Sequence, residues 1–189
     1  PKIYNKIKTI FEDKKFKVFE IKEFNLKKIM KFNVKKYSQL GSDRIANSIG
    51  AHYKFNSNCI IIDFGTATTF DIVKKKGLYD GGVIAPGIKL SIENLSQSTA
   101  LLPKFKLNKY PKKYGKNTHE ALASGFFWGY EGLLNNIIKK IVKKNGKNSK
   151  IVLTGGYSYL FKNRLVRKSK IDNDITMQGI IIIYKNFLI

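Results

Sequence analysis

The spacing of hydrophobic and polar positions changes at Asn56-Ser57-Asn58. Before this point, apolar residues recur at helical spacing from Ile3 to Phe11 and again from Asp43 to Tyr53, which predicts two helices. Phe16 to Ile21 is predicted to be a strand, whereas residues 25–39 are rich in lysine and show little periodicity. The N-terminal part of the chain therefore predicts a helix, a strand and a second helix, in that order.

Short apolar runs bounded by glycine follow this change. Cys59 to Ile62 is apolar throughout, which is typical of a strand buried on both faces. Strands are predicted at residues 59–62, 68–73, 78–85 and 151–153. Helices are predicted at residues 86–95 and 118–145, the second with Thr118 as its N-cap, while residues 179–189 fit either helix or strand. Strands followed by helices, with glycine turns at the strand ends, favour an α/β domain whose ligand site lies at those ends.

Composition places the chain among globular proteins. It has 189 residues, of which 43% are hydrophobic, enough for the core of one domain or two small ones. No apolar run approaches the roughly 18 residues of a membrane span, so no membrane partner is expected. Cys59 is the only cysteine, which excludes an intramolecular disulfide and predicts a reducing compartment. The chain begins with Pro1 rather than methionine, and we expect it to be a fragment.

The chain is strongly basic, with 36 lysines and arginines, 13 acidic residues and a net charge of +23. Such a charge raises the hypothesis of a nucleic-acid-binding module. Only Arg44, Arg164 and Arg167 are arginines, although arginine is the usual reader of phosphates and base edges. The lysines are spread along the whole chain, which favours solvated surfaces over a specific nucleic-acid interface. Such a surface still attracts anionic small molecules such as nucleotides.

The most informative motif runs from Asp63 to Thr69, with the sequence Asp-Phe-Gly-Thr-Ala-Thr-Thr. A predicted buried strand brings a carboxylate to a glycine turn, and small hydroxyl side chains follow. Glycine lets main-chain N–H groups approach a phosphate, threonine adds hydroxyl groups, and the carboxylate can hold a cation. The alternative is a structural turn beside threonines that simply favour strands.

Two more motifs combine glycine with the start of a helix. Gly41 to Arg44 places Asp43 beside Arg44, either as a helix cap with an ion pair or as a general base beside an anion clamp. Gly81 to Gly87 joins a strand to a helix. It is either a tight turn or a place where the backbone and the helix N-terminus approach an anionic ligand.

The remaining candidates carry weaker signals. Gly115 to Thr118 is either an anion-binding helix start or a simple cap, and its glycine spacing excludes a P-loop. Thr154 to Gly156 follows a strand, as a turn or as a place where a flat ligand such as adenine packs closely. His52 and His119 stand apart from other metal-ligand or nucleophile candidates, which argues against a metal centre or a catalytic triad.

Taken as an ordered set, these motifs resemble the type III pantothenate kinases. The segments that carry the resemblance are residues 40–47, 63–71, 81–87, 99–103, 115–118 and 154–156. The resemblance implies a duplicated ribonuclease-H-like fold of the acetate kinase, sugar kinase, Hsp70 and actin superfamily. We expect residues 1–56 to be the remainder of the N-terminal half and residues 57–189 to be the C-terminal half.

The resemblance also implies an activity, namely ATP-dependent phosphorylation of pantothenate to 4′-phosphopantothenate, the first step of coenzyme A synthesis. It implies a cytoplasmic homodimer with a substrate pocket at the subunit interface. The implied cofactors are ATP with a divalent metal, Mg²⁺ being expected, and a monovalent cation, K⁺ or NH₄⁺. Phosphoryl transfer agrees with the motifs, because it depends mainly on positioning, charge neutralisation and one base near the nucleophile.

The resemblance assigns roles to individual residues. Asp43 matches the general base, and Gly41, Ser42, Asp43 and Arg44 match the pantothenate-binding loop. Asp63 matches the monovalent-cation ligand, and Thr66, with Gly65 in the same turn, matches the ATP-phosphate contact. Thr118 matches a pantothenate contact made across the dimer, while Gly155 and Gly156 are expected to bind the nucleotide.

The chain departs from the family pattern in two places. The family begins with a strand and an Asp-x-Gly-Asn-Thr loop that holds ATP phosphates and the divalent metal, and this sequence contains no such loop. We therefore expect the strands at the beginning of the first half to be absent. A non-catalytic, regulatory relative of the kinase fold is the alternative function. The family also tends to have a substrate-contacting tyrosine before the Gly-x-Asp-Arg motif, where this chain has Tyr37 nearby.

Overall fold

The computed structural model describes residues 2–146 and 148–188. The helices are α1 (Lys2–Asp13), α2 (Ser42–Phe55), α3 (Ile88–Gln97), α4 (Thr118–Asn145), α5 (Ser158–Phe161) and α6 (Ile175–Phe187). The strands are β1 (Lys31–Phe32), β2 (Cys59–Phe64), β3 (Ala67–Lys74), β4 (Leu78–Pro86), β5 (Lys150–Gly155) and β6 (Ser169–Ile171). Short 3-10 turns lie at Ile21–Glu23, Leu26–Lys28 and Tyr37–Gln39.

The strands form one mixed sheet in the order β1-β4-β3-β2-β5-β6. β2, β3 and β4 make an antiparallel meander, and β5 and β6 continue the sheet parallel to β2. A three-stranded meander followed by two parallel strands is the sheet order of a ribonuclease-H-like domain, so the predicted fold class is confirmed. β1 pairs in parallel with β4 at the other edge.

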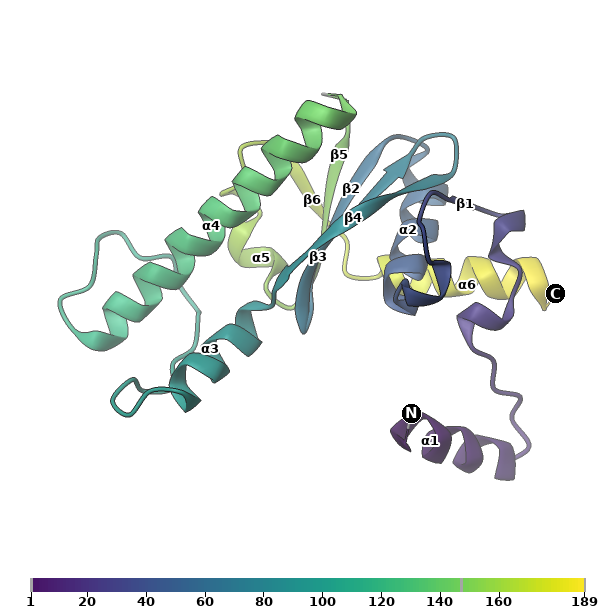
Figure 1. Cartoon of the computed structure of the whole chain (residues 1–189), viewed down its shortest axis with the longest axis horizontal. Helices are drawn as coiled ribbons and strands as arrows, with labels where there is room; N and C mark the ends of the chain where they lie inside the picture. Colours follow the sequence, from purple (N-terminus) through teal and green to yellow (C-terminus); the bar gives the residue numbers. More distant parts are fainter. Residues whose placement is uncertain (1, 147, 189) are drawn as a thin grey trace.

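Helices cover both faces of this sheet, as Figure 1 shows. Ile60 and Ile62 of β2 belong to the core shared with α3, α4 and α5, whereas Cys59 and Ile61 belong to the core shared with α2 and α6. Successive side chains of a strand point to opposite faces. Because both faces are covered, residues 59–62 of β2 are all apolar, which explains the continuous run that predicted the strand.

The predicted elements after Asn56 are confirmed, and residues 179–187 belong to α6. The strand predicted from Phe16 to Ile21 is wrong. Phe16 and Phe19 are 60% and 45% exposed, and this segment pairs with no strand of the described sheet. The two-residue strand β1 is too short to produce a periodic signal. The division of the chain at residue 56 stays a prediction, and β1 and α2 on its N-terminal side both contact the rest of the chain.

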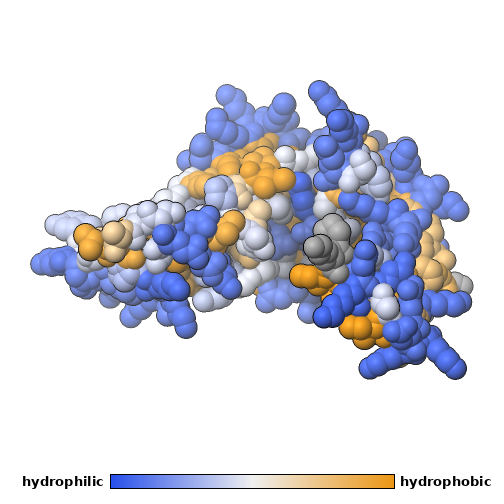
Figure 2. All heavy atoms as spheres, turned by 60° about the horizontal axis from the view of Figure 1, so that its bottom comes forward, coloured by the Kyte–Doolittle hydropathy of each residue, from blue (hydrophilic) through white to orange (hydrophobic). Residues whose placement is uncertain are grey.

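The surface is dominated by hydrophilic side chains, with separate hydrophobic patches between them (Figure 2). Some of the exposed apolar side chains lie on α1, namely Ile3, Ile7, Ile10 and Phe11. None of the helices within residues 2–146 and 148–188 combines the length and the apolar character of a membrane span.

Candidate functional site

The glycine motifs meet at one edge of the sheet. Phe64, at the end of β2, pairs with Gly155 at the end of the parallel strand β5. On the other side of β2, Ala67 at the start of β3 pairs with Pro86 at the end of β4. Three motifs that are widely separated in sequence are therefore adjacent, at the carboxyl ends of β2, β4 and β5 where α/β folds bind their ligands.

Two glycines at this edge allow backbone segments to approach closely. A Cβ atom on Gly87 would overlap the main-chain carbonyl of Thr66. Gly155 has a φ of +86°, and a Cβ there would lie 2.8 Å from Oδ1 of Asp63. Gly65, Thr66 and Gly156 are exposed. The absence of a side chain at Gly87 and Gly155 thus lets these segments pack against the turn after β2. The main-chain groups of the three exposed residues remain accessible to a ligand.

Gly156 is one of the residues that line a cavity of about 810 Å³. Its lining includes Lys89, Lys104 and Lys106, together with Tyr157 and Tyr159. Ammonium groups attract phosphate, and aromatic rings can stack on a flat base. The lining also includes Glu93 and the apolar residues Ile92, Phe105 and Leu107.

Asp43 lies in the first turn of α2, where it is exposed. The N-cap of this helix is Gly41, without a side-chain cap, so Asp43 does not have the capping role that the sequence allowed. Oδ1 of Asp43 accepts a hydrogen bond of 2.8 Å from the main-chain N–H of Arg44. This bond orients the carboxylate, and its other oxygen remains accessible for proton transfer.

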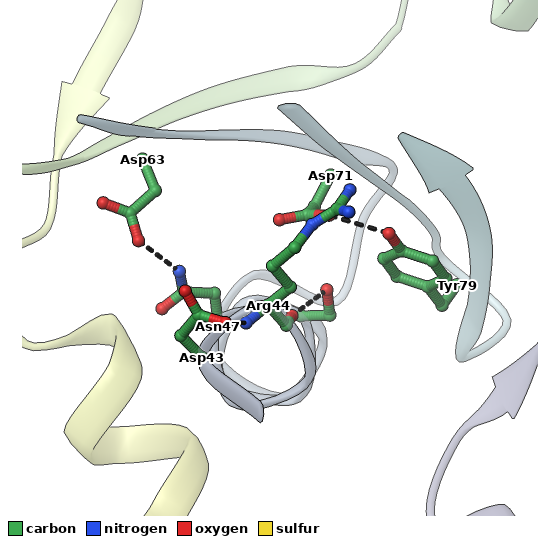
Figure 3. Close-up of polar contacts among 7 residues, drawn as sticks. Asp43, Arg44, Asn47, Asp63, Asp71 and Tyr79 are labelled. Atoms are coloured by element: carbon green, nitrogen blue, oxygen red, sulfur yellow. Dashed lines mark hydrogen bonds and ion pairs between the residues drawn. The ribbon is translucent and has the colours of Figure 1, made fainter. Parts of the chain in front are cut away.

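Arg44 forms a buried ion pair with Asp71 of β3 (Figure 3). Its Nε donates to Oδ1 of Asp71 at 2.8 Å and its Nη2 lies 2.7 Å from the same oxygen. Burial alone would lower the pKa of Arg44, but the charge and hydrogen bond of Asp71 outweigh it and raise that pKa. Burial raises the pKa of Asp71, while Arg44 and the hydroxyl of Tyr79 oppose that rise. Arg44 is thus a fixed cation at the start of α2.

Asn47, one turn after Asp43, connects α2 to the sheet and to α6. Its Nδ2 donates to Oδ2 of Asp63 at 2.9 Å, and its Oδ1 accepts from the hydroxyl of Thr176 at 2.5 Å. Asn47 is fully buried. It therefore fixes the carboxylate of Asp63 relative to the helix that carries Asp43.

The sequence did not assign roles to Asn47, Asp71, Tyr79 or Thr176. The signal for Asp71 was present, since it is an acid in a strand whose neighbours Phe70 and Ile72 are apolar. A charged residue on the covered face of a sheet needs a partner. Its partner Arg44 lies 27 positions away, and no local pattern reveals that pairing.

The described residues fit a monovalent cation better than a complete divalent-metal site. Residues 2–146 and 148–188 contain no group of three His, Cys, Asp or Glu side chains that could hold a metal. Asp63 offers Oδ1 close to Gly155, and the main-chain carbonyl of Phe64 lies beside the same glycine. One carboxylate supplemented by neutral oxygens suits a weakly charged ion, whereas divalent ions usually take more carboxylates or bound phosphates.

Thr118 is not close to Asp43 within the chain. It is the first residue of α4, whose N-terminal end lies far from α2 at the opposite side of the sheet (Figure 1). The predicted capping role belongs instead to Asn117, whose Oδ1 accepts from the N–H of Glu120 at 2.9 Å. The carboxylate of Glu120 lies in the first turn and accepts from the N–H of Lys116. An acidic side chain at this helix start disfavours an anion there, which supports the capping interpretation of Gly115 to Thr118.

Replacing Asp63 by asparagine should stabilise the protein more at about pH 7 than at about pH 4. Burial raises the pKa of Asp63, Asn47 partly opposes the rise, and Asp43 adds to it. The folded state therefore binds this proton more tightly than the unfolded chain. The stability that Asp63 contributes is complete below its ordinary pKa and is lost as the pH rises through its raised folded pKa. Asparagine keeps an oxygen to accept from Asn47 and carries no charge.

The measurement is urea unfolding of both proteins at the two pH values. Asp13→Asn, at an exposed position on α1, measures the effect of removing one negative charge from the surface. If the gain in the free energy of unfolding from Asp63→Asn stays constant or shrinks as the pH rises, the pKa of Asp63 is not raised in the folded protein.

Comparison with known proteins agrees with the motif pattern. The family model for type III pantothenate kinase matches residues 1–140. Type III pantothenate kinase of Pelagibacter ubique is 49% identical over 145 residues, which cover 77% of this chain and 58% of the relative. That of Koribacter versatilis is 47% identical over 148 residues, covering 78% and 54%. This chain thus spans a little over half the length of the curated relatives it matches.

The structure has a similar counterpart among solved structures. A crystal structure from Campylobacter jejuni, described as a Baf family transcriptional activator, superposes with a TM-score of 0.60 at 26% identity. The match covers 86% of this chain and 72% of that one. Motif order, sheet topology and the match of the family model over most of the chain lead to one conclusion. The chain belongs to the type III pantothenate kinase family.

Proposed function

We propose that the protein containing this chain transfers the γ-phosphoryl group of ATP to pantothenate, forming 4′-phosphopantothenate for coenzyme A synthesis in the cytoplasm. The observation that carries the proposal is the placement of Asp43. Its exposed carboxylate stands at the start of α2, next to the cation Arg44 and one turn before Asn47, which binds Asp63 at the end of β2. A base, an anion clamp and a phosphate-binding edge are the groups that this reaction needs.

Asp43 accepts the proton of the pantothenate hydroxyl as that oxygen attacks the γ-phosphorus. Gly41, Ser42 and Arg44 hold the substrate around this base. The main chain of Gly65 and the hydroxyl of Thr66 contact the phosphates at the edge of the sheet. Gly156 lines the cavity that would receive the nucleoside part of ATP, and Gly155 precedes it at the end of β5.

The cofactors proposed with ATP are a divalent metal, Mg²⁺, and a monovalent cation, K⁺ or NH₄⁺. Asp63 would hold the monovalent cation through Oδ1, since Oδ2 is used by Asn47. When bound, the two cations would neutralise phosphate charge during transfer.

The test is a coupled assay of ADP release by the complete gene product, with ATP, Mg²⁺ and pantothenate, in the presence and absence of K⁺. We expect turnover that requires pantothenate and increases with K⁺. A folded protein that releases no ADP under these conditions would contradict the proposal, and would favour a non-catalytic relative of the fold. Pantothenate-dependent turnover without any K⁺ effect would contradict only the monovalent site at Asp63.

A homodimer is part of the proposal, because Thr118 can reach a substrate at Asp43 only from another subunit. Thr118 borders an apolar groove of about 550 Å³ between α3 and α4. The α4 side of this groove includes the small residues Ala121, Gly125 and Gly129, at a spacing of four. Small residues one turn apart let another helix approach closely. We therefore propose that a second copy of the chain packs in this groove and brings its Thr118 to the substrate site.

Gly129→Leu should convert the dimer to a monomer. No atom lies within 4 Å of the position of a Cβ on Gly129, so the substitution does not disturb its own subunit, while it fills the groove. Sedimentation velocity of the complete gene product measures the change. Gly132→Leu is the matched control, because Gly132 is equally unobstructed on the same helix but does not line the groove. A Gly129→Leu protein that remains dimeric would exclude this groove as the interface.

A further inference from the structure

We propose that Asp71 and Tyr79 are positioning residues, which hold the guanidinium group of Arg44 in the orientation that binds pantothenate. The inference rests on the proposed function and adds to it two residues that lie within the sheet. Neither residue needs to touch the substrate, since both act through Arg44.

The geometry concentrates three hydrogen-bond donors on one oxygen atom. Oδ1 of Asp71 accepts from Nε and Nη2 of Arg44, and it also accepts a hydrogen bond of 2.8 Å from the hydroxyl of Tyr79 (Figure 3). Asp71 is fully buried and Tyr79 is 1% exposed. Donors of a charged group to a buried carboxylate form strong, directional bonds. The position of Oδ1 therefore determines the position of the guanidinium plane.

The backbone of β4 approaches this cluster closely at Gly82. A Cβ on Gly82, which pairs with Asp71 across β3 and β4, would overlap Nη2 of Arg44 and the carbonyl of Phe70. The guanidinium thus lies directly against the sheet. α2 supplies the arginine, and two neighbouring strands supply the groups that hold it.

The guanidinium retains donors for a ligand. Nη1 of Arg44 donates no hydrogen bond within the described part of the chain. Arg44 and Tyr79 line a cavity of about 550 Å³ together with Lys35, Lys36 and Gln39. An arginine held in advance loses less conformational freedom when it binds an anionic or hydroxylated substrate. Holding Arg44 should therefore favour substrate binding directly.

A purely structural ion pair would give a different result. In that case, weakening the cluster would lower stability and leave the kinetic constants for pantothenate unchanged. Asp71→Asn is a poor test, because it leaves the buried guanidinium without a counter-charge and is expected to impair folding. Tyr79→Phe removes only one hydroxyl group and is the better probe.

The experiment is a double-mutant cycle in the complete gene product, with Tyr79→Phe, Arg44→Lys and the double variant. Tyr79→Phe should lower kcat/KM for pantothenate about fivefold, with the KM for ATP unchanged. A lysine cannot form the forked contact with Asp71. Adding Tyr79→Phe to Arg44→Lys should therefore have almost no further effect. Tyr110→Phe is the matched control, because its hydroxyl also donates to a carboxylate, that of Glu131 at 2.7 Å, away from the site.

The outcomes separate this inference from the proposed function. A wild-type protein without pantothenate-dependent turnover refutes the proposed function and, with it, the substrate named here. An active wild type in which the effects of the two substitutions multiply refutes the positioning role alone. A Tyr79→Phe protein that melts at a lower temperature but keeps kcat/KM for pantothenate also refutes it.

Discussion

Asp43→Asn in the complete gene product should lower kcat about 1000-fold, while ATP still binds with nearly unchanged affinity. Asparagine has the shape of aspartate and can accept the same hydrogen bond from the N–H of Arg44, so the start of α2 should keep its structure. It cannot accept the proton of the pantothenate hydroxyl. The loss should therefore appear in the chemical step, measured by ADP release at saturating ATP and pantothenate.

Two measurements make this prediction specific. Binding of a non-hydrolysable ATP analogue should be retained, because the nucleotide contacts proposed here lie at the ends of β2 and β5. Asp13→Asn removes an exposed carboxylate at the end of α1 and should leave kcat unchanged. If Asp43→Asn turns over pantothenate at a rate near that of the wild type, Asp43 is not the general base.

Much of the sheet could be predicted from the sequence, because each element leaves a local pattern. The apolar run of β2 reflects the helices that cover both faces of the sheet. Gly146, with a φ of +87°, is the residue at which α4 ends. The glycine motifs predicted a ligand site at strand ends, and the structure brings Asp63, Gly87 and Gly155 to one edge. Local sequence spacing is sufficient to predict this site, because each glycine turn directly follows the strand at whose end it lies.

Pairings between distant segments could not be predicted in the same way. Arg44 meets Asp71, and Asn47 meets Thr176, across 27 and 129 positions. The sequence places Thr118 in the same ordered motif set as Asp43, yet the topology puts α4 at the other side of the molecule. The N-cap assignments failed for a simpler reason. Asp43 and Thr118 are both residue types favoured at caps, and only the backbone conformation decides that Gly41 and Asn117 have that role.

Gly179→Ala should destabilise the protein by about 3 kcal/mol. In an unobstructed helix, the same substitution usually stabilises by about 0.5 to 1 kcal/mol, because alanine loses less backbone entropy on folding. The sign changes here because a Cβ on Gly179 would overlap the main-chain carbonyl of Ala46. Gly50 shows the same restriction from the other helix, where a Cβ would overlap the carbonyl of Ile175. The two glycines thus define how closely α2 and α6 cross.

This crossing matters for the site as well as for stability. Moving α6 away from α2 would stretch the bond between Thr176 and Asn47, and Asn47 holds Asp63. Urea unfolding should therefore show a lower midpoint for Gly179→Ala, and the K⁺ site proposed at Asp63 should bind less tightly in the remaining folded protein. Gly132→Ala on α4 is the matched control, since no atom lies within 4 Å of its Cβ position and a small gain in stability is expected. If both substitutions stabilise, the helices can separate without cost, and the close crossing is not what positions the start of α2.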